Sequence, residues 1–248
     1  MKFCLLLARL LLITLLACSA ERAVAADLVL YYEERPPLMS RLDNQLTGVQ
    51  GAPAMAVLQR AGLTVELREA PVARQLAMIS RNAEPACALG LYRTAERERV
   101  GRYSRLPVYS SPPQSLMIRR DGRLKDIHRF ATALQSPTVT LALRLGYSYG
   151  AETDKALADS SARIIRSSDH SMARARLVLL GMADAALFTE EEGEALIKQF
   201  GEAGTALELR RLPDAPPGEG RFFFCNKALP DRQLRAIDDA MAVPRPGP

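Results

Sequence analysis

Residues 90–109 read GLYRTAERERVGRYSRLPVY, and their first letters complete an apolar run, ACALGLY (86–92), that is typical of a buried β-strand. On both sides of this stretch the chain alternates between strand patterns and helix patterns. Such alternation indicates a mostly parallel sheet whose faces are covered by helices. The stretch therefore predicts an α/β fold.

The first block of this alternation lies on the N-terminal side of the stretch. It contains predicted strands at 28–34, 64–70 and 86–92 and predicted helices at 47–62 and 72–82. The segment 106–123, LPVYSSPPQSLMIRRDGR, then interrupts the rhythm with prolines and polar residues.

The alternation restarts after this interruption. Predicted helices lie at 124–134, 151–161, 170–181 and 191–204, and predicted strands at 138–145, 162–168, 184–189 and 206–212. Asp169 is expected to cap the third of these helices. A second interruption, PDAPPGEG (213–220), precedes a last strand at 221–227 and a last helix at 230–242.

Two blocks separated by interruptions predict two lobes joined by two hinge crossings. The terminal strand and helix are too small to fold alone, so we expect them to pack on the first lobe. Lobe 1 is then 27–114 with 218–248, and lobe 2 is 115–217. A cleft between lobes is a favoured ligand site, and hinge closure around a ligand is a common conformational change.

The N-terminus predicts export. Residues 1–26 combine a basic start, an apolar run (10–17) and the small residues AVAA (23–26), which is the order of a secretory signal peptide. LLAC (15–18) is similar to a bacterial lipobox, so anchoring to a membrane through a lipid on Cys18 stays open. No other apolar stretch is long enough to span a bilayer. We expect a periplasmic protein.

The composition excludes several classes of partner. The net charge of +5 is mildly basic, and acids are interleaved with the arginines, so we expect no nucleic acid partner. The only histidines are His128 and His170 and no Cys/His cluster is present, so we expect no metal site and no cofactor. Cys87 and Cys225 remain in the mature chain, where they could form one disulfide or stay as two buried thiols.

The order of motifs resembles the periplasmic solute-binding proteins of amino-acid ABC transporters, also called bacterial extracellular solute-binding protein family 3. The motifs are YYEERPPL (31–38), LTGVQGAPAMAVLQ (46–59), APVARQLAMI (70–79), GLYRTAERERVGRYSRLPVY (90–109), LRLGYSYG (143–150), LLGMADAALFTEEE (179–192) and FFFCNK (222–227). They cover essentially the whole mature chain. The resemblance implies a type II, Venus-flytrap fold with the ligand between the lobes.

The resemblance assigns the ligand-gripping pair to lobe 1. In TAER (94–97), Thr94 and Arg97 match the residues that hold the ligand's carboxylate, and a guanidinium fork suits a carboxylate. Gly90 and Tyr92 match positions that contact the ligand. Tyr92 is bulkier than the residue common there, so the pocket is expected to differ in size.

Further site residues follow from the same resemblance. Tyr32 and Arg35 lie on the first loop, where an aromatic residue often covers the ligand, and Arg74 matches a position that points towards the cleft. The acid that holds an α-ammonium in lobe 2 falls at Thr189 or, with a one-residue slip, at Glu190. The resemblance also places Cys87 and Cys225 on neighbouring strands of lobe 1, where a disulfide is possible.

GYSYG (146–150) follows a predicted strand and has the Gly-x-Ser-x-Gly pattern of a hydrolase nucleophile turn. That reaction needs a histidine well downstream of the serine, whereas His170 opens the very next helix. A serine without a base is a poor nucleophile. We therefore expect Ser148 to bind a ligand with its hydroxyl and neighbouring amides, with Tyr147 or Tyr149 lining the pocket.

These observations predict a monomeric, exported solute-binding protein that is not an enzyme. It would capture a small carboxylate-bearing ligand, an amino acid or a related compound, for an ABC permease or a membrane sensor. The alternative is a periplasmic enzyme on the same fold, similar to the dehydratases that act on cyclohexadienyl acids. Glu33, Glu34 and Glu190 are the candidate general acids for that chemistry.

Overall fold

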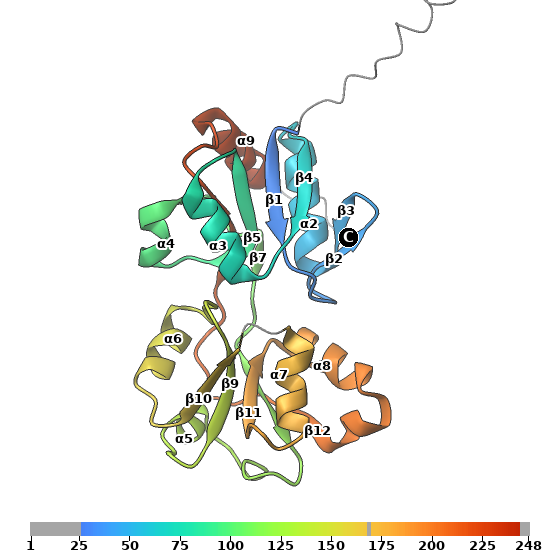
Figure 1. Cartoon of the computed structure of the whole chain (residues 1–248), viewed down its shortest axis with the longest axis vertical. Helices are drawn as coiled ribbons and strands as arrows, with labels where there is room; N and C mark the ends of the chain where they lie inside the picture. The colour runs from blue at the N-terminus through green and yellow to red at the C-terminus, as the bar shows by residue number, and fades with distance from the viewer. Residues whose placement is uncertain (1–25, 168–169, 244–248) are drawn as a thin grey trace, which may run out of the picture.

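A computed structural model describes residues 26–167 and 170–243. The predicted signal peptide up to residue 25, with Cys18, lies outside the described residues, and so does the predicted helix cap Asp169. Figure 1 shows two α/β units stacked along the long axis of the molecule and joined at a narrow waist. The predicted α/β class and two-lobed architecture are confirmed.

Lobe 1 is built on a mixed sheet with the strand order β4-β1-β5-β13-β6, in which β7 also pairs with β13. Strands β1, β4 and β5 are parallel neighbours, whereas β13 runs antiparallel to β5. The last strand and helix therefore return to lobe 1, as expected. The strands are β1 (Leu28–Tyr32), β4 (Val65–Glu69), β5 (Ala86–Tyr92), β6 (Arg102–Tyr103), β7 (Tyr109–Ser110) and β13 (Gly220–Cys225).

Helices cover both faces of this sheet because successive side chains of a strand point to opposite faces. Leu28, Leu30 and Tyr32 pack in one cluster with α2 (Gly48–Arg60) and α9 (Asp231–Ala242). Val29 and Tyr31 pack in a second cluster with α3 (Val72–Arg81). A strand that is buried on both faces reads as a continuous apolar run, which explains why LVLYY lacks polar alternation. The hairpin β2 (Ser40–Leu42) and β3 (Gln45–Thr47) and the short helix α4 (Ala95–Val100) complete lobe 1.

Lobe 2 repeats this layered plan with the strand order β10-β9-β11-β8-β12. Its strands are β8 (Ser115–Arg119), β9 (Thr140–Arg144), β10 (Arg163–Ser167), β11 (Ala185–Phe188) and β12 (Leu207–Arg210). Its helices are α5 (Phe130–Leu134), α6 (Ala151–Ala158), α7 (Ser171–Leu179), α8 (Glu190–Gln199) and the 3₁₀ helix η1 (Gly201–Ala206). Two apolar clusters lie on the two faces of the sheet.

Two predicted helices of lobe 2 differ from the observed ones. The segment 124–134 is helical only from Phe130, because the Asp214 carboxylate accepts hydrogen bonds from the backbone N–H groups of Phe130 and Ala131 at 2.6 and 3.2 Å and so caps the helix there. The segment 191–204 divides into α8 and η1 after Gln199.

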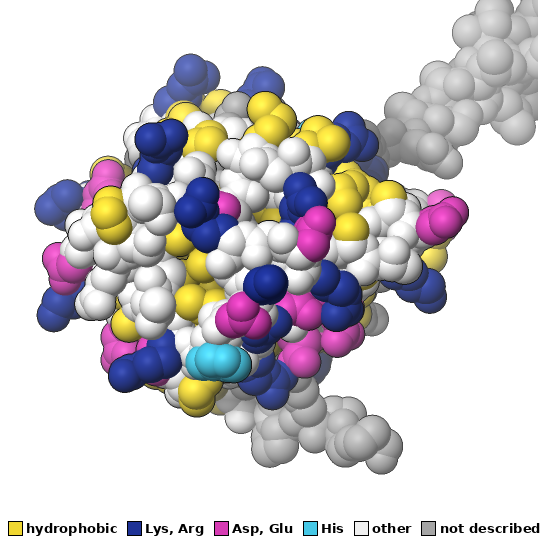
Figure 2. Space-filling model, turned by 90° about the horizontal axis from the view of Figure 1, so that it is seen from below, with side chains coloured by type: hydrophobic (Ala, Val, Ile, Leu, Met, Phe, Trp, Pro, Cys, Tyr) yellow, Lys and Arg dark blue, Asp and Glu magenta, His cyan; other side chains and the backbone are white. Residues whose placement is uncertain are grey.

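In the view of Figure 2, from the lobe 2 end, Lys and Arg side chains are scattered among acidic and apolar ones.

The two sheets use residues 28–110 with 220–225, and residues 115–210. The chain therefore passes between them in 111–114 and in 211–219, and the two connecting segments run through the waist in Figure 1. The predicted lobe boundaries, 114/115 and 217/218, fall within or at the end of these connections. We keep them as the definition of the lobes.

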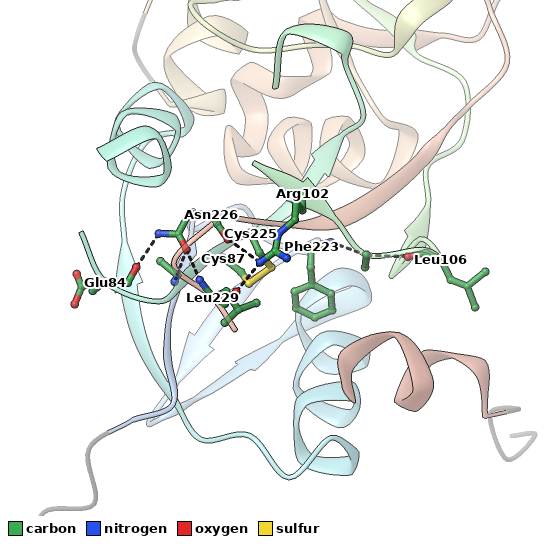
Figure 3. Close-up of a disulfide and its surroundings, with 10 residues drawn as sticks. Glu84, Cys87, Arg102, Leu106, Phe223, Cys225, Asn226 and Leu229 are labelled. Carbon is green, nitrogen blue, oxygen red and sulfur yellow. Dashed lines mark hydrogen bonds between the residues drawn. A yellow bond between two sulfur atoms is a disulfide. The ribbon is translucent and has the colours of Figure 1, made fainter. Parts of the chain in front are cut away.

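A disulfide ties the C-terminal strand of lobe 1 into its sheet. Cys87 on β5 and Cys225 on β13 are direct partners in the antiparallel register and are bonded through their sulfur atoms. Both side chains are fully buried. Next to the bridge, Asn226 donates to the carbonyl of Glu84 at 2.7 Å and accepts from the backbone N–H of Leu229 at 3.2 Å (Figure 3). The predicted disulfide is confirmed.

Candidate functional site

A pocket with a volume of about 620 Å³ lies between the lobes. One wall comes from α3 and α4 of lobe 1, and the other from the β9–α6 loop, α6 and β10 of lobe 2. Its lining residues are Leu76, Ser80, Thr94, Glu96, Arg97 and Val100 from lobe 1, and Leu145, Gly146, Tyr147, Ser148, Asp154 and Arg166 from lobe 2. The structure thus brings Thr94, Arg97, Tyr147 and Ser148 together at one cavity.

Local structure fixes Arg97 in the wall of this pocket. Thr94 is the N-cap of α4, and its hydroxyl oxygen accepts a hydrogen bond from the backbone N–H of Arg97 at 3.3 Å. The Arg97 side chain turns back so that Nη1 donates to the carbonyl oxygen of Tyr92 at 2.8 Å. Arg97 is only 7% exposed. A buried guanidinium that is held by a neutral carbonyl keeps its positive charge available to an anion.

The opposite wall is the GYSYG loop, which is stabilised by an acid of the following helix. Asp154 accepts from the Ser148 hydroxyl at 2.5 Å and from the backbone N–H of Tyr149 at 2.8 Å. The Ser148 oxygen in turn accepts from the backbone N–H of Gly150 at 3.3 Å. The Ser148 hydroxyl and the neighbouring backbone amides, which we expected to face a ligand, therefore form hydrogen bonds within this segment of the chain. Ser148 borders the pocket, but its hydroxyl proton points to Asp154.

A buried ion pair crosses from one lobe to the other beside this site. Glu33, which follows β1, accepts from both terminal nitrogens of Arg144 at the end of β9. The side chains are 8% and 2% exposed, respectively. The lobes are therefore closed on one another, with a carboxylate of lobe 1 neutralising a guanidinium of lobe 2.

A second interlobe cluster contains Arg35, Tyr147, Glu192 and Arg221. Arg35 forms a two-pronged ion pair with Glu192 of α8, and it also donates to the hydroxyl of Tyr147 at 2.6 Å. Arg221 of β13 donates to the same hydroxyl at 2.9 Å. These contacts join charged side chains of lobe 1 to a tyrosine and a carboxylate of lobe 2.

The arginines determine the protonation of their partners. Burial alone would raise the pKa of Glu192, but the adjacent Arg35 and Arg174 guanidiniums lower it to about 2. Burial would likewise raise the pKa of Tyr147, and the charges of Arg221 and Arg35 outweigh this effect and lower it. Glu192 is thus a carboxylate throughout the neutral range.

A smaller pocket of about 360 Å³ borders the Arg35–Glu192 pair. It is also interlobe and is lined by Glu34, Arg35, Pro36, Glu69, His170, Ser171, Met172, Glu192, Leu196 and Gln199. Arg35, which the sequence placed near the ligand, borders this second pocket and not the Arg97 pocket.

The other predicted site residues lie away from the Arg97 pocket. Gly90 adopts φ +77°, and its carbonyl accepts from Arg221 at 3.1 Å. The ring of Tyr92 packs under the Arg221 guanidinium, 4.0 Å from Cζ to the ring centroid. Tyr32 belongs to the apolar core of lobe 1 and Arg74 is exposed on α3. Glu190 is paired with Arg211 on the surface of lobe 2.

Sequence reasoning missed Asp154, the ion-pairing roles of Arg144 and Glu192, and the hydrogen bonds that Arg221 donates to Tyr147 and Gly90. Two of them carried a signal, since Arg144 ends an apolar strand and Arg221 begins one, and a charge in such a position needs a partner.

Within residues 26–167 and 170–243, no group of three or more His, Cys, Asp or Glu side chains could hold a metal ion. No helix in the same ranges has both the length and the apolar content required to cross a bilayer.

Solved structures of known proteins share this two-lobed architecture. The substrate-binding protein of an amino acid ABC transporter superposes with a TM-score of 0.67 at 15% identity, covering 86% of this chain and 91% of that one. The chain has the fold of the periplasmic solute-binding proteins.

Two further solute-binding structures extend the comparison. The arginine-binding protein of T. maritima gives a TM-score of 0.65 at 17% identity and covers 86% of this chain and 88% of its own. An ancestral amino acid-binding protein, a precursor of cyclohexadienyl dehydratase, gives 0.63 at 19% identity, with coverage of 86% and 87%. No protein-family model matches the chain, and neither does any curated protein.

Proposed function

We propose that this protein is an exported solute-binding protein that captures a small carboxylate-bearing ligand in the pocket beside Arg97. The observation that carries the proposal is the interlobe pocket of about 620 Å³ with Thr94 and Arg97 on one wall and the GYSYG loop on the other. A pocket of this size suits a small molecule. Closure of the two lobes is the mechanism by which this fold encloses a ligand.

The chemistry of the wall favours a carboxylate on the lobe 1 side. Arg97 is buried, and the bond to the Tyr92 carbonyl fixes its guanidinium without neutralising it. A planar guanidinium binds a carboxylate through two parallel hydrogen bonds, and a low-dielectric wall strengthens them. Lobe 1 would bind the ligand first, and lobe 2 would then close over it, because a ligand that contacts both lobes binds the closed state more tightly.

The biological partners follow from the fold and the N-terminus. A periplasmic location, through the predicted signal peptide or through a lipid on Cys18, gives the protein access to solutes outside the inner membrane. We propose that the closed lobes are presented to an ABC permease or to a membrane sensor. The protein would act as a monomer and would need no cofactor.

A thermal-shift screen over amino acids, amines and dicarboxylates tests this proposal. A ligand at a hundredfold its dissociation constant adds about 2.7 kcal/mol to the free energy of unfolding, which is a readily measured rise in Tm. We expect at least one carboxylate to raise the Tm in a saturable way and simple amines to leave it unchanged. A panel in which amines stabilise the protein and no carboxylate does would contradict the proposal.

The alternative function is an enzyme on the same fold, and the structural likeness to a precursor of cyclohexadienyl dehydratase keeps it under test. The candidate general acids are poorly placed for it. Glu33 is held by Arg144, Glu190 pairs with Arg211, and Glu34 borders the smaller pocket. Incubation of purified protein with arogenate and prephenate distinguishes an enzyme from a binding protein, because turnover of either compound would favour the enzyme.

A further inference from the structure

The side chain of Arg35 leaves lobe 1 and inserts into a cluster of lobe 2 residues. Its Nε and Nη2 donate to the two carboxylate oxygens of Glu192 at 3.1 and 2.8 Å, and Nη1 donates to the Tyr147 hydroxyl at 2.6 Å. The Tyr147 ring lies near the same group, 5.4 Å from Cζ to the ring centroid. Each of the three guanidinium nitrogens therefore has a partner, and all of these partners belong to lobe 2.

Lobe 2 holds this acid in place through contacts of its own. Glu192 is 2% exposed, and it accepts a further hydrogen bond from the Ser171 hydroxyl at 2.5 Å. Arg174 donates to the Ser171 oxygen at 3.2 Å, and Thr189 accepts from the backbone N–H of Glu192 at 3.4 Å. These residues lie on α7, on α8 and at the N-cap of α8, so the position of the carboxylate does not depend on Arg35 alone.

We propose that lobe 2 contains a guanidinium-binding site and that Arg35 of the same chain is its resident ligand. A fixed carboxylate matches the fork of a guanidinium, a hydroxyl takes the remaining edge, and an aromatic ring attracts the cation. An ammonium lacks the fork and can satisfy only part of this arrangement. Arg35 thus determines specificity by exclusion, because a guanidinium-bearing solute finds the site filled. This goes beyond the capture of a carboxylate by Arg97 and does not depend on it.

The site is accessible once Arg35 is shortened. The pocket of about 360 Å³ borders Arg35, Ser171 and Glu192 and opens between the lobes. Arg35→Ala removes a fragment with the composition of ethylguanidinium, so added ethylguanidinium should enter from this pocket and occupy the vacated volume. The proposal therefore makes a prediction about a defined small cation.

The experiment is a chemical complementation of Arg35→Ala. The variant and the wild type are titrated with ethylguanidinium chloride at constant ionic strength, and Tm is followed. We expect the variant to have a lower Tm than the wild type, and ethylguanidinium to raise it in a saturable way while the wild type shows no saturable response. Ethylammonium should bind the variant at least about tenfold more weakly, because the two-pronged contact is lost.

Two further variants control for general effects of charge. Arg211→Ala removes an exposed arginine that also pairs with an acid of α8, Glu190, and it should gain no response to ethylguanidinium. Adding Glu192→Gln to Arg35→Ala should abolish the response. A folded Arg35→Ala variant without a saturable response, or with an equal response to ethylammonium, overturns the proposal. If the variant folds only with a ligand, ethylguanidinium must restore its native circular dichroism, and failure at every concentration also overturns it.

Discussion

Glu33 of lobe 1 and Arg144 of lobe 2 form a two-pronged ion pair in which both side chains are almost fully buried. Because the pair spans the lobes, each buried charge is neutralised by its partner only while the lobes are closed. Opening the lobes would expose both charges to water, whereas removing one partner would leave the other buried and unpaired in the closed form. The pair therefore couples the stability of the protein to the closed state.

Glu33→Gln should lower the free energy of unfolding by about 3–5 kcal/mol, because Arg144 then carries an uncompensated buried charge. Urea denaturation measures the loss. Glu33→Gln combined with Arg144→Met removes the unpaired buried charge and should recover part of the lost unfolding free energy. If the double variant loses as much unfolding free energy as the two single variants lose together, the two residues do not act as a pair.

The pairing of Glu192 predicts a pH dependence. The pKa of Glu192 falls from an ordinary value of 4.5 to about 2 in the folded state, so its contribution to stability is fully present above pH 4.5 and is lost as pH falls through about 2. The difference in unfolding free energy between the wild type and Glu192→Gln should be constant from pH 7 to 5. It should then decrease steadily in more acidic buffers. A difference that already changes between pH 7 and 5 would contradict this assignment.

The disulfide should stabilise lobe 1. Cys87 and Cys225 are 138 residues apart in sequence, and loss of a native bridge typically costs about 2–5 kcal/mol. Addition of a reductant should therefore lower the denaturation midpoint of the wild type. Cys87→Ala combined with Cys225→Ala should begin at the lower midpoint and be insensitive to the reductant. A wild-type midpoint that does not move under reducing conditions would show that the bridge makes no such contribution.

Ser148 tests which groups of the GYSYG loop contact the ligand. Because its hydroxyl donates to Asp154, Ser148→Ala should change the dissociation constant of a carboxylate ligand by less than about threefold. Isothermal titration calorimetry with a ligand from the screen measures this effect. A loss of more than tenfold would mean that the hydroxyl leaves Asp154 and bonds to the ligand.

The fold was predictable because its signals are local. LVLYY and ACALGLY are continuous apolar runs, and strands that are buried on both faces require such runs. The pairing of Cys87 with Cys225 followed from a resemblance that places the last strand beside 86–92. By contrast, the start of α5 depends on Asp214, more than eighty residues away, and no local pattern contains that information.

The interlobe contacts were less predictable for a related reason. Thr189 and Glu192 fit the Thr-x-x-Glu pattern of a capping box, which predicts that the Glu192 side chain turns back to its own helix. Its carboxylate instead binds Arg35, which is 157 residues away. Three consecutive acids begin α8, and only the way in which the lobes meet decides which of them is buried. The role of Arg97 was predicted from the resemblance and stays a prediction; the structure shows that Arg97 lines the interlobe pocket.

Calorimetric titration of Arg97→Ala tests the central claim most directly. With a carboxylate ligand from the screen, this variant should lose at least about thirtyfold in affinity, because a buried guanidinium that pairs with the ligand is removed. Arg99→Ala, on the same helix but exposed, should stay within about twofold, since solvent screens its charge. A folded Arg97→Ala variant that binds the ligand as tightly as Arg99→Ala would contradict the proposed carboxylate site.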